Sequence, residues 1–209
     1  MNANDPARPL RLALLTSHGG GHCMHVAEQI EAGVVRGIEL AAVITENPEA
    51  AVIDKCRRRG LPIRVVPWPG ASERAEHECA LLQVLEAHRV DLVGLVGYLR
   101  LVGPRFIAPW NDRLFNLHPS LLPAYPGLHA IARAFDAREP WLGATVHWVD
   151  ERCDTGAHIV QRGLLRMPND TLETITARVH RLEASLLTDA LNRLTTSVAP
   201  RTPYPETLA

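Results

Sequence analysis

Three side chains with complementary chemistry lie in one stretch of the sequence, between Asn116 and Asp154. Asn116 and His118 stand at alternate positions of an apolar segment, and Asp154 follows in a short polar loop, residues 150–156. An amide and a protonated imidazole can donate hydrogen bonds to a negative oxygen, and a carboxylate can assist a proton transfer. These residue types therefore predict a site that stabilises an oxyanion and moves a proton.

The segment from Arg113 to His118 is predicted to be a strand. Positions i and i+2 of a strand project from the same face, so Asn116 and His118 are expected to point into one cleft. Pro119 has no backbone N–H and biases the residue before it toward an extended backbone, which predicts that the strand ends at His118. A single Asn or His at the end of a strand more often only forms a hydrogen bond to a neighbouring loop. The surrounding motif is therefore needed to support a catalytic role for Asn116 and His118.

Apolar runs of strand length alternate with segments of helical period, which predicts βαβ units and a mostly parallel sheet. The predicted fold class is α/β, a single-domain Rossmann-like three-layer sandwich over residues 1–209, with flexible tails at 1–8 and 198–209. Ligands bind beyond the carboxyl ends of strands in such sheets. Strands are expected at 10–16, 40–45, 63–66, 91–96, 113–118, 144–149 and 159–165. Helices are expected from the 17–22 loop to about 35, and at 48–59, 72–88 with Ser72 as its cap, 128–137 and 171–194.

The composition is that of an ordinary globular protein, with 46% hydrophobic and 22% charged residues. Lys+Arg 22 against Asp+Glu 23 give a formal net charge of −1, so no basic field for nucleic acid is expected. No apolar run reaches the roughly eighteen residues of a membrane helix, and no secretory signal is predicted. The four cysteines lack Cys-x-x-Cys spacing, which predicts reduced thiols and a cytoplasmic location.

A longer motif surrounds the candidate catalytic residues. Residues 116–123 read Asn-Leu-His-Pro-Ser-Leu-Leu-Pro, followed by Tyr125, Gly127 and Asp154-Thr155-Gly156. This pattern resembles the folate-dependent formyltransferase family, and similar segments at 95–101, 143–147 and 175–183 extend the likeness over most of the chain. Such a run of matched types is far more specific than a lone glycine-rich loop. The resemblance implies the formyltransferase fold, 10-formyltetrahydrofolate as co-substrate and no metal.

The resemblance also implies a catalytic sequence. A substrate amine attacks the formyl carbon, and Asn116 and protonated His118 donate to the oxyanion that forms. Asp154 favours the imidazolium and relays a proton toward N10 of the leaving folate, through water. The folate-binding residues that the resemblance implies are Arg74, Leu99, Arg100, Leu101, Val102, Asn116, Asp150 and Asp154.

The glycines at 19–21, after the first strand, are expected to present backbone N–H groups at a helix N-terminus, a position that favours an anion. The alternative is a tight turn that needs glycine for its backbone angles alone. The resemblance places the acceptor there, and relatives carry a Ser-Asn pair where this chain has Gly21-His22, and often a lysine at the position of Ala124. The implied acceptor-binding residues are Gly20, Gly21, His22, His180 and Glu183.

Three functions therefore remain open. The first is formyl transfer to glycinamide ribonucleotide in purine biosynthesis, and the second is transfer to another amine, such as an amino sugar or a siderophore-type hydroxylamine. The third is hydrolysis of 10-formyltetrahydrofolate. The spacing of His18, His22 and His25 suggests a metal, but no acidic ligand lies nearby in sequence, so none is expected. The expected partners are a small-molecule amine and folate, without nucleic acid or membrane, in a monomer or homodimer.

Overall fold

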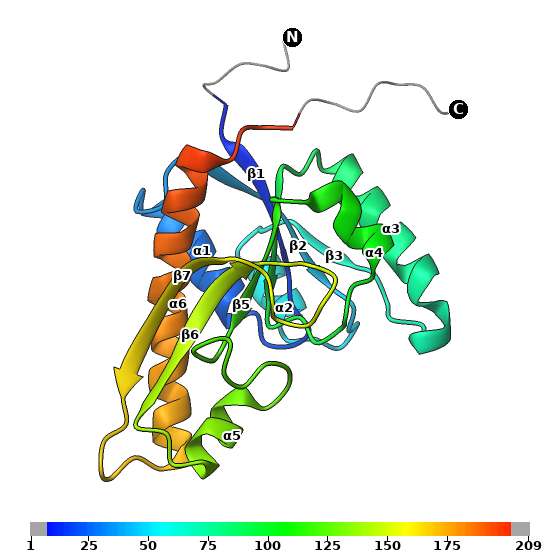
Figure 1. Cartoon of the computed structure of the whole chain (residues 1–209). Coiled ribbons are helices and arrows are strands. Elements are labelled where there is room, and N and C mark those ends of the chain that lie inside the picture. Colours follow the sequence, from blue (N-terminus) through cyan, green and yellow to red (C-terminus); the bar gives the residue numbers. More distant parts are fainter. Residues whose placement is uncertain (1–7, 202–209) are drawn as a thin grey trace.

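The computed structural model describes residues 8–201, which form one seven-stranded sheet with helices on both faces (Figure 1). The strand order is β3-β2-β1-β4-β5-β6-β7. The first five strands pair in parallel, whereas β6 and β7 are antiparallel to their neighbours. This sheet confirms the predicted α/β class with a mostly parallel centre.

The bounds of the elements follow the predicted alternation of strands and helices. The strands are β1 (Leu10–Leu15), β2 (Ile38–Thr45), β3 (Ile63–Val65), β4 (Leu92–Val96), β5 (Leu114–His118), β6 (Trp141–Trp148) and β7 (His158–Leu165). The helices are α1 (Gly21–Glu31), α2 (Val52–Arg58), α3 (Arg74–Ala87), α4 (Pro104–Ile107), α5 (Ala130–Asp136) and α6 (Leu172–Ser197), with short 3-10 turns η1 (Ala71–Glu73) and η2 (Ala108–Trp110).

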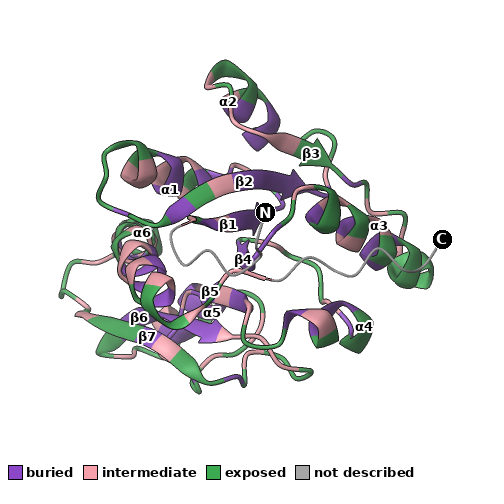
Figure 2. Cartoon of the chain, turned by 90° about the horizontal axis from the view of Figure 1, so that it is seen from above, coloured by how far each residue is buried: buried purple, intermediate pink, exposed green. Residues whose placement is uncertain are grey.

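The two largest hydrophobic clusters lie between the sheet and its helices, and a smaller third cluster joins α5, α6 and β6. One face of the sheet is covered by α1, α2 and α6, whose buried residues Cys23, Val52 and Leu186 belong to one cluster. The other face is covered by α3 and α4, with Leu81 and Phe106 in a second cluster. The buried colouring accordingly concentrates along the central strands between these helical layers (Figure 2). Strands covered on both faces read as continuous apolar runs, which is why β1 and β4 are detectable in the sequence.

Several helix ends differ from the sequence expectation. The second helix begins at Val52, not at residue 48, and Ser72 lies inside the 3-10 turn η1 instead of capping α3. Serine also favours turns, which explains the error at Ser72. At α6, by contrast, Thr171 accepts a hydrogen bond from the backbone N–H of Thr174 and forms a capping box, so this helix starts where expected. The short elements α4 and η2 were not predicted, because a four-residue helix carries no periodic signal.

Most of the predicted tails, residues 1–7 and 202–209, lies outside the described residues. Within the described part, the Arg8 guanidinium donates to both carboxylate oxygens of Asp91, at 2.6 and 2.9 Å. The backbone N–H of Arg201 donates to Asp91 at 2.6 Å. Asp91 is buried beside the start of β4, so the inner ends of both segments are held at one point. Among residues 8–201, no helix has the length and apolar character needed to cross a membrane.

The contact between β4 and β5 depends on a glycine, and it supports the strand that carries Asn116. A Cβ atom at Gly94 would lie 2.4 Å from Phe115 Cζ and 2.9 Å from Leu14 Cδ2, two fully buried side chains. We therefore expect Gly94→Ala to lower the free energy of unfolding by about 1–3 kcal/mol through overpacking, as measured by urea denaturation.

Gly163→Ala is a matched control, because its Cβ would meet only ordinary contacts, the nearest at 3.4 Å. This control is expected to change stability by less than about 0.5 kcal/mol. Equal stability of the two variants would contradict the packing role of Gly94.

Candidate active site

Asn116 and His118 lie at the carboxyl end of β5, as the position of Pro119 predicts. The antiparallel pairing of β5 with β6 places Asn116 opposite His147 and His118 opposite Thr145. Directly opposed residues of paired strands share one face of the sheet. The strand pairing therefore puts Asn116, His118 and His147 on the same side.

Asp154 is the common partner of these side chains. Asn116 Nδ2 donates to Asp154 Oδ1 at 3.1 Å, and the backbone N–H of Gly127 donates to Oδ2 at 2.7 Å. His118 Nδ1 lies 3.4 Å from Oδ2, and His147 Nε2 lies 3.5 Å from Oδ1. The structure thus brings the predicted residues Asn116 and His118, together with His147, around the carboxylate of Asp154.

The surroundings of Asp154 keep its carboxylate ionised. Burial raises the pKa of Asp154, but hydrogen bonds from His147 and the Gly127 N–H, together with the nearby charge of His118, lower it by more. The net result is a pKa well below the usual range for aspartate. An acid with so low a pKa is a weak base near neutral pH, so its strongest effect is electrostatic stabilisation of neighbouring cations.

The orientation of the His118 ring is set by a backbone carbonyl. His118 Nε2 lies 2.9 Å from the carbonyl oxygen of Tyr125, and that oxygen can only accept a hydrogen bond. Nε2 therefore carries a proton and donates it to Tyr125. The second nitrogen, Nδ1, faces Asp154, so a protonated His118 has its other N–H on the same side as the Asn116 amide.

His147 was missed as a functional residue by the sequence analysis. Its Nδ1 donates to the carbonyl oxygen of Trp148 at 2.8 Å, and its Nε2 lies 3.3 Å from Asn116 Nδ2. The His147 ring therefore contacts the NH2 group of Asn116 and also adjoins the Asp154 carboxylate. The only signal for this role was the segment 143–147, whose pairing against β5 is not written in the sequence.

The Asp-x-Gly motif has a packing explanation. A Cβ atom at Gly156 would lie 1.8 Å from the carbonyl oxygen of Trp148, so the loop can return beside β6 only with glycine there. Asp150 is turned into the same loop, where it accepts hydrogen bonds from Thr155 Oγ1 at 2.7 Å and from the Arg152 N–H at 3.1 Å. Asp150 thus shapes the loop that carries Asp154.

The residues expected to bind folate follow β4, which is the parallel neighbour of β5. Leu99 and Leu101 are 51% and 70% exposed, and Val102 packs against the second hydrophobic cluster. The Arg100 guanidinium lies over the Trp68 ring, and its Nε is 3.3 Å from Glu46. The apolar surface and the candidate catalytic residues therefore follow the carboxyl ends of two neighbouring strands.

Arg74 lies farther along this edge, at the first position of α3. Its Nε is 3.6 Å from Glu78, which accepts a hydrogen bond from the Gly103 N–H at 2.6 Å. About half of the Arg74 side chain is exposed. Arg74 therefore borders the end of the segment 99–103, with its charge open to solvent.

In the glycine loop, Gly20 has a left-handed backbone, and a Cβ atom there would lie 2.2 Å from Val52 Cγ2. A structural need thus accounts for Gly20. Gly21 starts α1, and nothing in the described part of the chain lies within 4 Å of the position of its Cβ. No side chain of the described residues caps α1, so its first N–H groups are suited to an anion. Lys55 Nζ donates to the Gly19 carbonyl at 2.7 Å and adds a positive charge.

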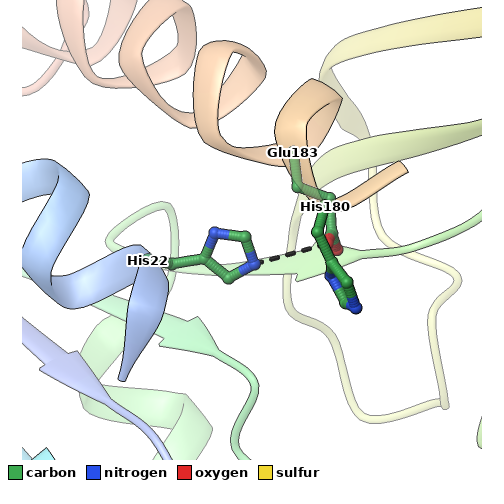
Figure 3. A group of neighbouring side chains, drawn as sticks. All are labelled: His22, His180 and Glu183. Carbon is green, nitrogen blue, oxygen red and sulfur yellow. Dashed lines mark hydrogen bonds and ion pairs between the residues drawn. The ribbon is translucent and has the colours of Figure 1, made fainter. Parts of the chain in front are cut away.

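His22, His180 and Glu183 come together from the start of α1 and the middle of α6 (Figure 3). Glu183 Oε2 lies 2.7 Å from His180 Nδ1 and 3.3 Å from His22 Nε2. Burial raises the pKa of Glu183, but these two imidazoles lower it by more, and Glu183 in turn raises the pKa of His180. His25 is not part of this group, because its ring bonds to Thr188 Oγ1.

Comparison with known proteins supports a family relationship. The sequence profile of the formyl transferase family matches residues 10–191. A phosphoribosylglycinamide formyltransferase of Bacillus subtilis is 38% identical over 143 residues, which cover 68% of this chain and 73% of that protein. The crystal structure of phosphoribosylglycinamide formyltransferase from Bacillus halodurans has a TM-score of 0.82 at 35% identity, covering 88% of this chain and 94% of that one.

A much longer relative is similar over most of this chain. The trifunctional purine biosynthetic protein adenosine-3 of Drosophila melanogaster is 35% identical over 194 residues, or 92% of this chain. This chain spans only 14% of the length of that protein. The similarity therefore concerns one part of the trifunctional protein.

The lowered pKa of Asp154 predicts a pH effect on stability. Between about pH 5 and pH 3 an unfolded aspartate takes up a proton, while folded Asp154 stays ionised. Its stabilising contribution is therefore full above the ordinary pKa of 3.8 and is lost as the pH falls toward the lower folded value. We expect the unfolding free energy of the wild type to fall more steeply over this range than that of Asp154→Asn. Denaturant titrations at both pH values test this, and parallel pH dependences would count against it.

Proposed function

Because the chain belongs to the formyl transferase family, we propose that it transfers a formyl group from 10-formyltetrahydrofolate to a substrate amine. The observation that carries this proposal is the convergence of Asn116, His118 and the ionised Asp154 beside an exposed apolar edge. An acyl transfer needs hydrogen-bond donors where negative charge develops, and this arrangement supplies an amide and an imidazole.

The reaction begins when the amine nitrogen attacks the formyl carbon, whose carbonyl oxygen becomes an oxyanion. The Asn116 amide and the Nδ1–H of protonated His118 donate to this oxyanion. Each such donor contributes about 3 kcal/mol of transition-state stabilisation. Asp154, ionised beside these donors, stabilises the imidazolium and the positive charge that develops on the attacking nitrogen.

The intermediate then collapses by breaking the bond between the formyl carbon and N10 of the folate. The attacking nitrogen loses one proton and N10 gains one, so the products are a formamide and tetrahydrofolate. The low pKa of Asp154 makes its carboxylate a poor acceptor for this proton. We therefore assign the proton transfer to water beside Asp154 and give the carboxylate an electrostatic role.

The folate is assigned to the edge formed by residues 99–102. Leu99 and Leu101 offer exposed apolar surface, and the loop 150–156 carries the catalytic carboxylate of Asp154. Arg74 and Arg100 are the cations of this edge, suited to the carboxylates of a folate tail. Backbone groups of the same segments supply the remaining hydrogen bonds.

The first candidate acceptor is glycinamide ribonucleotide. The similar proteins of Bacillus subtilis and Bacillus halodurans carry the name of that activity. The uncapped start of α1 and the charge of Lys55 suit a phosphate, and Glu183 suits an amine. A second acceptor class, another amine such as an amino sugar or a hydroxylamine, is favoured by Gly21-His22 and Ala124, where relatives place other residues.

Assays under three conditions separate these possibilities from each other and from hydrolysis: no amine, glycinamide ribonucleotide, and other amines. Release of tetrahydrofolate without any amine supports a hydrolase, whereas release only with glycinamide ribonucleotide supports the first acceptor. A response to other amines alone supports the second class.

The four free cysteines agree with a reducing, cytoplasmic location, and a monomer or homodimer stays a prediction for the oligomeric state.

Removing the Asn116 donor provides the direct mutational test. We expect Asn116→Ala to lower kcat by about 100-fold, which corresponds to the roughly 3 kcal/mol of one lost oxyanion donor. Turnover is measured by the absorbance change on tetrahydrofolate release. Asn111→Ala is the control, because that amide is exposed and donates a hydrogen bond to the carboxylate of its neighbour Asp112 at 3.1 Å. A variant at 116 with the turnover of the control would contradict the proposed role.

A further inference from the structure

We propose that His22, His180 and Glu183 form a binding site for a divalent transition-metal ion of the zinc class. Two imidazole nitrogens and one carboxylate oxygen are the donor set of many zinc sites that keep an open position. The same set suits cobalt and nickel, whereas magnesium and calcium prefer oxygen ligands alone. The same three residues are those that the family resemblance assigns to the acceptor, so the proposal adds a metal ion to that site, and the binding of the ion can be measured independently of formyl transfer.

The distances among the donor atoms fit such an ion. Tetrahedral zinc with bonds of about 2.0–2.1 Å holds its ligand atoms about 3.3 Å apart. Glu183 Oε2 lies 2.7 Å from His180 Nδ1 and 3.3 Å from His22 Nε2, and all three donors lie within 4.8 Å of one another. The His180 side chain is 56% exposed, so its ring is free to make the adjustment of about an ångström that metal binding requires.

The supporting structure holds the other two donors in place. Glu183 is 3% exposed and lies on α6, which contributes Leu186 to the cluster shared with α1 and α2. His22 lies in the first turn of α1, next to the buried Cys23, and α1 packs directly against α6. Donors on packed helices keep a fixed geometry, which is what a selective metal site needs.

The three ligands leave one position of a tetrahedral ion open, and one of them, His22, lies in the first turn of α1. Figure 3 shows His22 reaching from the start of α1 toward Glu183, with His180 beside it. The neighbouring Gly21 has open space where a side chain would be. A bound ion would therefore hold a water molecule or an anionic oxygen of a ligand at the start of α1.

The metal site is separate from the catalytic carboxylate. Asp154 is surrounded by Asn116, His118, His147 and Gly127, none of which belongs to the group of His22, His180 and Glu183. Metal binding can therefore be measured without reference to turnover.

The test is a titration of the full chain, freed of metal with a chelator, with Zn²⁺ in a calorimeter and with Co²⁺ by visible absorption. We expect one ion per chain and the intense absorption of four-coordinate Co²⁺, which Zn²⁺ abolishes. His180→Asn and Glu183→Gln should each weaken Zn²⁺ binding by at least about 10-fold. His158→Gln, which changes an exposed histidine of β7, should leave the affinity unchanged.

Three outcomes would overturn the inference: no heat of Zn²⁺ binding, equal affinities in His180→Asn and His158→Gln, or only six-coordinate Co²⁺ spectra. Circular dichroism of each variant verifies folding, and His22→Asn provides a second, less buried ligand change if Glu183→Gln is unfolded. Turnover with the chelator present is recorded in parallel, so that failure of the metal site and failure of formyl transfer are separate results.

Discussion

The structure depends on one buried, ionised carboxylate and the donors that surround it. Asp154 has only a tenth of its side chain exposed, and such a charge is costly to bury unless hydrogen bonds and opposite charges compensate it. The Asn116 amide, the Gly127 N–H and the imidazoles of His118 and His147 supply that compensation. Because these partners come from three segments, namely β5, the loop at Gly127 and β6, the requirement to satisfy this carboxylate fixes how those segments meet.

The sheet topology and two glycines make this meeting possible. Antiparallel pairing of β6 with β5 sets His147 opposite Asn116, a neighbour that a fully parallel sheet would not provide. Gly156 lets the loop of Asp154 run against the backbone of Trp148, and Gly94 leaves room for Phe115 behind the catalytic strand. The chemistry of the site is thus a consequence of close backbone packing as much as of its polar side chains.

The sequence was sufficient for the features that depend on local pattern. The alternation of β5 predicted that Asn116 and His118 share a face, and continuous apolar runs predicted the parallel centre. The sequence was insufficient where partners are distant along the chain. The role of His147 follows from strand pairing, and the group of His22 with His180 and Glu183 follows from the packing of α1 on α6. The sequence spacing suggested His18 and His25 as partners of His22. Local spacing carries no information about α6, which supplies the actual partners His180 and Glu183.

The central claim, that the Asp154 carboxylate and the Asn116 amide act as one unit, is tested most directly by a double-mutant cycle. The kcat of formyl transfer is measured for Asn116→Ala, Asp154→Asn and the double variant. Residues that act as a unit are strongly non-additive, so the double variant is expected to lose about as much activity as the worse single variant. Losses that simply multiply would contradict the account, because they would mean that the amide and the carboxylate contribute independently.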